Sequence, residues 1–419
     1  MSTPLTNWAG NVRFQHRRFH APESLVQLQN VVRQAQRVRC VGKGHSFNAC
    51  ADTTQDLITL EKMPQELELR GDVVTCSAAT TYVELAAFLE RNGAALHNLS
   101  STPHVSVMGA IATCTHGSGD GNGNLTSAVR SVVYVDAGGD VREARAGSDE
   151  LQAIVLGALG VVYSVTLETQ PSYRIRQDRY TGLPWASVDA SFDALMSCAS
   201  SVSLFTRWDA SGVQQAWVKR RVPVAPPTRN FFLGSLASAP LHMVPGMDPA
   251  SCTPQGEPGA WNERLPHFRA ECPPSADGDE LQSEYFVARE HASRAMRAMR
   301  SVATDLADVL LCGEVRSIAA DDFWLSPAYG RAVIAFHFTW TSDEARVRSV
   351  LPSLEAALAP FEAVPHWGKL SLFTALRLCA LYGDRLRRWA AVARRVDPSG
   401  KFRNEMLDQL VAAAAESKL

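Results

Sequence analysis

Two glycine-rich segments carry the residue types that point most directly to chemistry. The first is Gly42-Lys43-Gly44-His45-Ser46-Phe47-Asn48, and the second covers residues 100–119 (SSTPHVSVMGAIATCTHGSG). Small residues let the backbone approach a ligand, and successive N–H groups in such loops bind anions, so a pyrophosphate is the expected ligand. One such loop is typical of a tight turn, but two loops on neighbouring units favour a large phosphate-bearing cofactor.

Three other kinds of site fit these loops poorly. Phe47 stands where a Rossmann fingerprint needs its third glycine. His104, Cys114 and His116 lack the spacing of metal ligands, so no metal site is expected. Gly117-Ser118-Gly119 lacks the G-x-S-x-G pattern, which leaves a serine hydrolase acting through Ser118 as a minor alternative.

His45 lies inside the first loop, between a glycine and a hydroxyl residue. A lone histidine usually serves only as a hydrogen-bonding side chain. An imidazole in a cofactor loop can also act as a covalent nucleophile, so both interpretations stay open from the residue alone.

The composition is that of an ordinary globular protein. The chain has 419 residues, 46% hydrophobic and 20% charged, with a formal net charge of −2. This length predicts two or three domains. Because the basic residues are scattered, nucleic acid and anionic membranes are not expected as partners, and small-molecule chemistry becomes the default. Nine cysteines without a C-x-x-C pair are typical of reduced thiols.

The two ends of the chain bear on where the protein resides. Residues 1–10 lack the basic and apolar regions of a secretory signal, which predicts a cytoplasmic protein. The apolar stretch 155–165 is far shorter than the ~20 residues of a transmembrane helix. Ser417-Lys418-Leu419 would be a peroxisomal address in a eukaryote. Six lysines among 41 basic residues indicate a GC-rich bacterial gene, so this tripeptide is attributed to chance.

The elements that must position the two loops form an α+β domain ending near residue 170. Thr81 and Glu84 make a capping box that opens a helix, which Gly93 ends. The other expected elements are a helix at 23–36, strands at 38–41, 72–78, 129–135 and 161–167, and a hairpin turn at 136–140.

A second domain is expected from a βαββαβ pattern. Residues 223–274 precede it and combine many prolines with aromatic residues, which predicts an ordered, loop-rich segment. The expected strands are 281–287, 311–318, 332–340 and one near Lys369, and the expected helices are 288–310 and 343–361.

Strand periodicity places polar residues of this domain on common faces. Glu314 and Arg316 share one face of their strand, and His337 and Thr339 share one face of theirs. Each pair can therefore point into one pocket, although a structural ion pair between Glu314 and Arg316 is the alternative.

The same loops resemble a known family. Residues 42–48, Ser101-x-Pro103-His104-x-Ser106 and Thr115-His116-Gly117-Ser118-Gly119 resemble the vanillyl-alcohol oxidase superfamily of FAD enzymes. Further segments along the whole chain are similar to bacterial alditol (xylitol) oxidases. These are Thr6-Asn7-Trp8-Ala9-Gly10-Asn11, Ser203-Leu204-Phe205-Thr206, Arg264-Leu265-Pro266-His267-Phe268-Arg269, Leu281-Gln282-Ser283-Glu284-Tyr285 and Pro365-His366-Trp367-Gly368-Lys369.

The resemblance implies a two-domain FAD-binding fold of the vanillyl-alcohol oxidase type. Residues 1–170 would bind FAD, and residues 171–380 would form a substrate-binding cap that contains the βαββαβ unit. Residues 381–419, around Asp397-Pro398-x-Gly400-Lys401-Phe402-x-Asn404, would complete the FAD domain.

The resemblance also implies how the cofactor is held. His45 matches the histidine joined to the 8α carbon of the flavin. Serines stand at 100 and 101, near the position where some relatives carry a second, cysteinyl link, so one link is expected. The other implied cofactor-binding residues are Gly42, Lys43, Gly44, Ser46, Ser100, Ser106, Gly109, Thr113, His116, Gly117, Ser118, Gly119 and Val161.

The implied substrate is a small polyol, whose desolvated hydroxyls need charged donors and acceptors. The implied catalytic residues are Lys369, Arg316 and Glu314, and the implied substrate-binding residues are Ser101, Thr339, Gln282 and His337. The activity would be oxidation of a primary alcohol of an alditol, such as xylitol or sorbitol, to the aldose, with dioxygen reduced to hydrogen peroxide. Lys369 and Arg316 would stabilise the developing alkoxide while FAD accepts hydride.

Several alternatives remain at this point. A sugar-lactone oxidase or dehydrogenase would use the same fold, and a flavin-binding protein without turnover is a further possibility. Ser100 is small and would lie beside the flavin, which favours an oxidase because dioxygen then has a path to the reduced cofactor. A monomer is expected.

Overall fold

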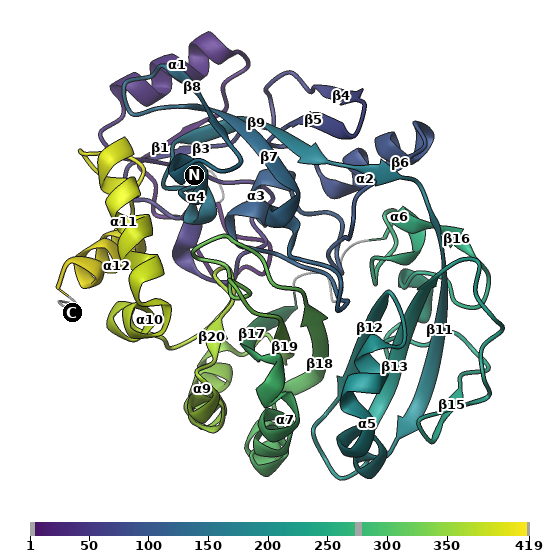
Figure 1. Ribbon diagram of the computed structural model, residues 1–419. Helices are drawn as coiled ribbons and strands as arrows, with labels where there is room; N and C mark the ends of the chain where they lie inside the picture. Colours follow the sequence, from purple (N-terminus) through teal and green to yellow (C-terminus); the bar gives the residue numbers. More distant parts are fainter. Residues whose placement is uncertain (1–4, 273–278, 417–419) are drawn as a thin grey trace.

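Two β-sheets of different size form the frame of the protein (Figure 1). The computed structural model describes residues 5–272 and 279–416. The potential address Ser417-Lys418-Leu419 lies outside the described residues. Within the described ranges, the smaller sheet has five strands and the larger has ten. Every described helix is too short or too polar to span a lipid bilayer.

The smaller sheet is antiparallel and is built from the N-terminal part of the chain. Its strands, in spatial order, are β4 (Leu67–Arg70), β5 (Val73–Ser77), β9 (Val161–Glu168), β7 (Val129–Val135) and β8 (Val141–Arg145). A parallel three-stranded sheet accompanies it, with the order β1 (Arg18–His20), β3 (Asp56–Ile58) and β2 (Val38–Cys40).

The helices of this region begin at the residues that cap them. Ser24 accepts a hydrogen bond from Gln27 N at the start of α1 (Leu25–Gln34), and Thr81 and Glu84 form the predicted capping box of α2 (Tyr82–Arg91). The same apolar core contains α3 (Val107–Ala112), α4 (Asp149–Gln152), α10 (Ala375–Tyr382), α11 (Asp384–Val396) and α12 (Glu405–Glu416). On this ground we propose that the C-terminal helices complete the first domain.

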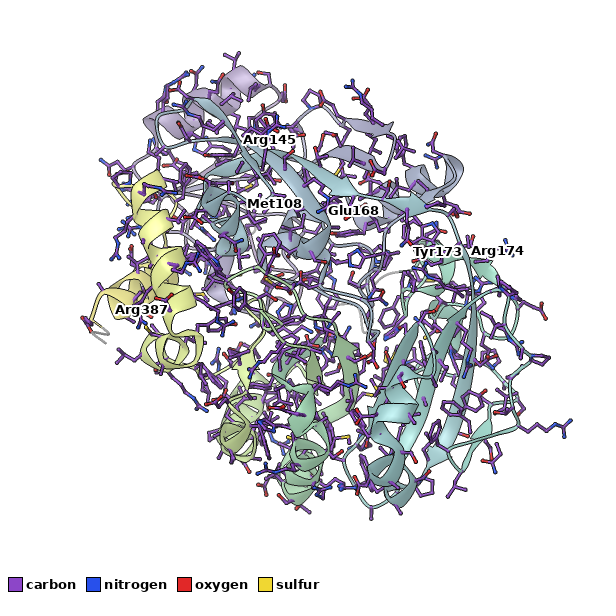
Figure 2. All side chains as sticks on the ribbon, viewed as in Figure 1. Met108, Arg145, Glu168, Tyr173, Arg174 and Arg387 are labelled. Atoms are coloured by element: carbon purple, nitrogen blue, oxygen red, sulfur yellow. The ribbon has the colours of Figure 1, made fainter. Side chains whose placement is uncertain are left out.

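The chain crosses to the larger sheet through Tyr173 and Arg174 (Figure 2). Just before the crossing, β10 (Gln170–Pro171) pairs with β6 (Ala94–Ala95). The Tyr173 hydroxyl donates to Leu96 O over 3.0 Å, and the guanidinium of Arg221 lies 3.7 Å from the centre of the Tyr173 ring. The crossing is therefore tied to both parts of the molecule.

The predicted βαββαβ strands lie side by side at one end of the larger sheet. Its order is β14 (Asn230–Phe231), β15 (Gly234–Leu236), β11 (Arg174–Leu183), β13 (Val213–Arg221), β12 (Ser201–Thr206), β18 (Leu310–Ile318), β19 (Val333–Thr341), β17 (Glu280–Ala288) and β20 (Val364–Pro365), with β16 (Gly259–Ala260) beside β11. The helices α5 (Trp185–Ser197), α7 (Ala292–Ser301) and α9 (Glu344–Leu358) lie along one side of it (Figure 1).

Side-chain alternation gives the larger sheet one apolar and one polar face. Leu204, Val315 and Phe336 belong to the core shared with the helices. The residues beside them in sequence point the other way, and the register aligns Glu314 opposite His337 on the neighbouring strand. Because the period of a strand is two, burying the apolar set against the helices places the charged set on the other face.

Two predicted elements are wrong. The helix predicted for 288–310 is interrupted, because α7 ends at Ser301 and the short α8 (Ala303–Leu306) precedes β18. The strand predicted near Lys369 is replaced by the two-residue β20. Pro365 has no N–H with which to extend a ladder, and the chain turns so that Lys369 N donates to His366 O.

The segment predicted to be ordered and loop-rich is described up to residue 272, and we call residues 223–272 the proline-rich segment. It contains β14, β15, β16 and α6 (Trp261–Arg264). Its Met243, Val244 and Phe268 pack with Phe205 and Trp217 of the larger sheet in a small apolar cluster. The proline-rich segment therefore covers part of the larger sheet. Cys40, Cys50, Cys76, Cys114, Cys198, Cys252, Cys272 and Cys312 are free thiols, as expected.

Candidate active site

A cavity lies between the two glycine-rich loops and the polar face of the larger sheet. The predicted site residues that line it are Gly42, Lys43, Gly44, His45, Ser46, Ser100, Ser101, Ser106, Gly109, Thr113, His116, Val161, Gln282, Glu314, Arg316, His337, Thr339 and Lys369. Residues more than 300 positions apart in sequence thus meet around one space.

The first loop has the properties of an anion-binding cradle. Among the described residues, none accepts a hydrogen bond from the backbone N–H groups of residues 42–46. Gly42 and Gly109 both approach Ser106, and a Cβ on Gly109 would lie 2.7 Å from Ser106 Oγ. The two glycines therefore let the loops pack closely at Ser106. The free N–H groups fit a phosphate-bearing cofactor lying against the first loop.

His45 lies in the part of the cavity next to the first loop. Its ring centre is 5.2 Å from that of Trp8, and no described residue makes a hydrogen bond to it. Burial, with smaller effects of His104 and Lys43, lowers the pKa of His45 to about 4. The imidazole is therefore neutral near pH 7, which is the form that can act as a nucleophile.

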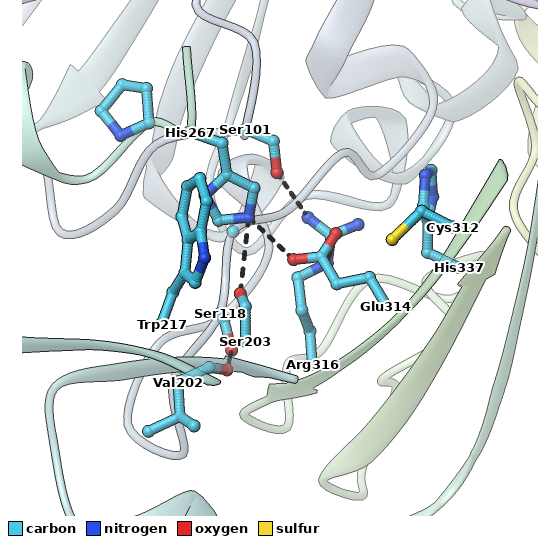
Figure 3. A network of polar contacts seen from close by, with 12 residues as sticks. Ser101, Ser118, Val202, Ser203, Trp217, His267, Cys312, Glu314, Arg316 and His337 are labelled. Atoms are coloured by element: carbon cyan, nitrogen blue, oxygen red, sulfur yellow. Dashed lines mark hydrogen bonds and ion pairs between the residues drawn. The ribbon is translucent and has the colours of Figure 1, made fainter. Parts of the chain in front are cut away.

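Gly117, Ser118 and Gly119 were predicted to bind the cofactor but do not line the cavity. The Ser118 hydroxyl donates to Val202 O over 2.5 Å (Figure 3), and Gly119 N donates to Ser317 O over 2.9 Å. These contacts tie the second loop to two strands of the larger sheet. Because the Ser118 proton is bound to a backbone carbonyl, the geometry also argues against the serine hydrolase.

Arg316 is the centre of the polar half of the cavity. Its Nη2 donates to Glu284 Oε1 over 2.6 Å, and its Nη1 donates to Ser101 Oγ over 3.1 Å. Its Nε lies 3.5 Å from Glu314 Oε2. The expected Glu314–Arg316 pair therefore exists, but the shorter contact of Arg316 is with Glu284.

Lys369 reaches the same carboxylate from the turn after β20. Its Nζ donates to Glu284 Oε2 and to His337 Nδ1, each over 2.7 Å. Because His337 Nδ1 is an acceptor, its Nε2 carries the proton, and Nε2 lies 3.2 Å from Thr339 Oγ1. Burial, followed by the charge of Lys369, lowers the pKa of His337 to about 4, so the ring is neutral.

Glu284 is a central residue that the prediction missed. It is 1% exposed and lies within 3.2 Å of His116 Nε2 as well as contacting Lys369 and Arg316. Burial alone raises its pKa, but the charges of Lys369 and Arg316 hold the pKa of Glu284 well below its ordinary value. Glu284 is two positions from Gln282, so strand periodicity would have placed it on the same face.

His267 is the second missed residue, and it comes from the proline-rich segment. Its Nε2 lies 2.8 Å from Glu314 Oε1 (Figure 3), and Glu314 is held ionised, because Arg316 and His267 outweigh the burial that raises its pKa. No periodicity marks a loop residue, so the sequence carried no geometric signal for His267.

The remaining wall of the cavity contains Phe205, Met243, Val244, Phe268 and Cys312. Within the described ranges, no group of three or more His, Cys, Asp or Glu side chains is arranged to hold a metal ion.

Comparisons with known proteins give the same picture. The model of the FAD binding domain family matches residues 17–145, and that of D-arabinono-1,4-lactone oxidase matches residues 279–410. The prediction of an FAD-binding domain is therefore confirmed. An alditol oxidase from Streptomyces sp. (strain IKD472 / FERM P-14339) is 42% identical over 419 residues, covering 98% of this chain and 100% of that protein.

Other relatives are more distant. An L-gulono-1,4-lactone dehydrogenase from Mycobacterium tuberculosis (strain CDC 1551 / Oshkosh) is 29% identical, covering 97% of this chain and 98% of that protein. The crystal structure of cholesterol oxidase from B. sterolicum superimposes with a TM-score of 0.76 over 97% of this chain and 96% of that chain. At 12% identity this likeness shows the fold alone. The predicted two-domain FAD-binding fold is confirmed.

Proposed function

The chain belongs to the alditol oxidase family of FAD-binding proteins, and on this premise we propose that it oxidises a primary alcohol of a small polyol to the aldehyde, with dioxygen reduced to hydrogen peroxide. The observation that carries the proposal is the group of Arg316, Glu284 and Glu314, which are buried, and Lys369, which is partly buried, beside the cofactor loops. Such a set of charged donors and acceptors suits the adjacent hydroxyls of a polyol, which lose their water on binding.

FAD is proposed to lie along the first loop and the residues from Ser100 to Thr113, with its pyrophosphate near the free N–H groups. His45 is proposed to be joined to the flavin 8α carbon, since it is the neutral histidine of that loop. Bound FAD supplies the redox chemistry, taking a hydride from the carbinol carbon and passing two electrons to dioxygen.

The residues of the cavity orient the substrate and stabilise charge. Lys369 and Arg316 are proposed to donate hydrogen bonds to the oxygen of the hydroxyl that is oxidised, which stabilises the negative charge that develops there as its proton passes to solvent water. Glu314 and Ser101 would bind the next hydroxyl, and Thr339 and Gln282 would contact hydroxyls further along the chain. Because these groups are fixed by the sheet before substrate arrives, little reorganisation is needed.

A sugar-lactone oxidase or dehydrogenase is the second candidate. It is favoured by the lactone oxidase family match, which spans β17, β18, β19 and Lys369. A lactone ring presents fewer hydroxyls than an open alditol. The identity to the alditol oxidase relative is also higher than to the lactone dehydrogenase relative, 42% against 29%. We therefore place the alditol first.

A steady-state screen of C4–C6 alditols against aldonolactones tests the proposal, with oxygen uptake and hydrogen peroxide measured in parallel. We expect alditols to have the higher kcat/KM and peroxide to form in equal amount to aldehyde. A higher kcat/KM for lactones, or turnover only with an artificial electron acceptor, would replace the proposal by the second candidate. The protein is expected to act as a monomer in the cytoplasm, which sizing of the purified enzyme and fractionation of the source cells would test.

A further inference from the structure

Lys219 is a buried lysine on the polar face of the larger sheet, outside the group assigned above. It lies on β13 and is 0% exposed. Its Nζ donates to Leu265 O over 2.5 Å, to Pro266 O over 3.0 Å and to His267 Nδ1 over 3.2 Å. Burial, followed by the charge of Arg179, lowers the pKa of Lys219 well below its ordinary value, and the charge of Glu314 opposes this shift. The three acceptors match the three N–H donors of the ammonium form.

His267 connects this lysine to the candidate active site. Because Nδ1 accepts from Lys219, the proton of the neutral ring is on Nε2, which donates to Glu314 Oε1 over 2.8 Å. Ser203 Oγ, 3.5 Å away, is a second and weaker partner of the same nitrogen (Figure 3). Burial, followed by the charge of Lys219, lowers the pKa of His267 to about 4, so the ring remains neutral near pH 7.

The opposite tautomer would be unfavourable at both ends. A proton on Nδ1 would face the N–H of Lys219, and the lone pair on Nε2 would face the Glu314 carboxylate. The order of donors therefore runs in one direction, from Lys219 through His267 to Glu314. One oxygen of Glu314 is bound by His267, and Oε2 is on the side of Arg316.

We propose that Lys219 is a positioning residue for substrate binding, acting through the tautomer and orientation of His267 to present Glu314 Oε2 to a substrate hydroxyl. This inference rests on the proposed function for the identity of the substrate. It assigns a role to a residue that touches neither substrate nor cofactor. The two lysines act on histidines in the same way, since Lys369 also donates to Nδ1 of its partner, His337.

The positioning role of Lys219 must be distinguished from a purely structural role, in which Lys219 only anchors the proline-rich segment. Lys219 holds the backbone of the proline-rich segment, and so does Gln177, its partner in register on β11. Gln177 is 0% exposed, and its Nε2 donates to Thr253 O over 3.1 Å and to Pro254 O over 3.0 Å. Within the described part of the chain, the side-chain hydrogen bonds of Gln177 do not involve His267, so Gln177→Leu is a matched control for loss of anchoring.

The kinetic test compares Lys219→Met, His267→Gln, the double variant and Gln177→Leu in the flavin-loaded enzyme. The side-chain amide introduced by His267→Gln keeps a hydrogen-bond donor near the position of Nε2. Unlike the imidazole, the amide has no second tautomer for Lys219 to influence. We expect Lys219→Met to raise KM for the alditol about tenfold, the effect of one misplaced charged hydrogen bond, with kcat changed by less than about threefold. In the His267→Gln background the same change should alter KM by less than about twofold.

Two kinetic results would overturn the inference. One is additivity, in which Lys219→Met raises KM equally in both backgrounds. The other is an equal rise in KM in Gln177→Leu, which would make anchoring of the segment the whole effect. A fall in melting temperature in Lys219→Met and Gln177→Leu alike, with a KM change only in the former, supports it.

A second measurement needs no substrate. The holoenzyme labelled with ¹⁵N-histidine reports the protonation of each ring nitrogen, and His267→Gln identifies the signals of His267. We expect Nδ1 without a proton and Nε2 with one in the wild type, and a change in this pattern in Lys219→Met. A proton on Nδ1 in the wild type would overturn the inference. If no alditol is oxidised, the proposed function fails, while the NMR result still decides whether Lys219 sets the tautomer of His267.

Discussion

Lys369 Nζ lies 2.7 Å from Glu284 Oε2, although 85 positions separate the two residues in the chain. Glu284 also accepts a hydrogen bond from Arg316, so one buried carboxylate is paired with two cations. Taking such groups out of water is costly, and removing one partner leaves an uncompensated charge. Substitution of Lys369 and substitution of Glu284 should therefore differ in their effects on catalysis and on stability.

Lys369→Met should mainly affect catalysis. Glu284 keeps Arg316 as a partner, so we expect a small change in melting temperature. Loss of a donor to the developing alkoxide should lower kcat/KM for the alditol by about 10²–10³-fold. Near-normal turnover, or a variant that chiefly loses thermal stability, would show that Lys369 is structural.

Glu284→Gln should affect both stability and catalysis. The buried Arg316 and the partly buried Lys369 lose their shared countercharge, and breaking a buried pair typically costs about 3–5 kcal/mol. Since Glu284 raises the pKa of Lys369, which burial lowers, its loss also favours the uncharged amine. Urea unfolding and steady-state kinetics would measure the two effects.

Glu355→Gln is the matched control for Glu284→Gln. Glu355 is also buried, but it accepts from the Tyr285 hydroxyl and Leu372 N on the apolar side of the sheet. We expect it to lower the free energy of unfolding without changing kcat/KM. Equal kinetic losses in both variants would refute the assignment of Glu284 to the active site.

His45→Ala should abolish covalent attachment of the flavin and leave the fold intact. After acid precipitation, wild-type protein should retain flavin fluorescence in the pellet, whereas the variant should release it to the supernatant. His291→Gln serves as the control, because His291 lies outside the cavity lining and packs near Phe361 in the core shared with the helices. Flavin released from the wild type as well would disprove the link.

Ser100 should influence the reaction with dioxygen. Its hydroxyl donates to Thr102 O over 2.7 Å, and the residue lines the cavity. We expect Ser100→Ala to be reoxidised at least as fast as the wild type and Ser100→Leu about tenfold more slowly, because the larger side chain closes the space beside the cofactor. Stopped-flow mixing of anaerobically reduced enzyme with oxygenated buffer measures these rates.

Ser101→Ala is the control for that experiment. Ser101 contacts Arg316, so its loss should raise KM and leave reoxidation unchanged. A wild-type enzyme that stays reduced for minutes in air would contradict the oxidase assignment and favour a dehydrogenase.

The stability of the protein should fall as the pH is lowered from about 6.5 towards 4. His267 and His337 have a pKa of about 4 in the folded state, first because of burial, whereas histidine in an unfolded chain titrates near 6.5. The unfolded state therefore binds more protons in this window, and each histidine contributes about 2 kcal/mol to the loss between pH 7 and pH 5. Urea unfolding of wild type and His267→Gln at both pH values tests this, since the variant should lose less; an identical loss would contradict it.

Much of the local architecture followed from the sequence by itself. The capping box of Thr81 and Glu84, the strands around Glu314 and His337 and the shared face of Glu314 and Arg316 were all predicted, because caps and strand periodicity depend on residues a few positions apart. The small residues around His45 predicted a cofactor-binding loop, and the resemblance to a known family predicted the FAD-binding fold.

Only the tertiary structure decided which of these residues meet. Glu284 becomes the partner of Arg316 and Lys369 because β17 lies beside β19, and His267 reaches Glu314 because the proline-rich segment folds over β13 and β12. Ser118 and Gly119 lie outside the cavity lining for the same reason, since they bond to strands more than 80 positions away. Local spacing sets the face on which a side chain stands, but the order in which distant strands pair sets its neighbours, and that order depends on burial of the whole apolar face at once.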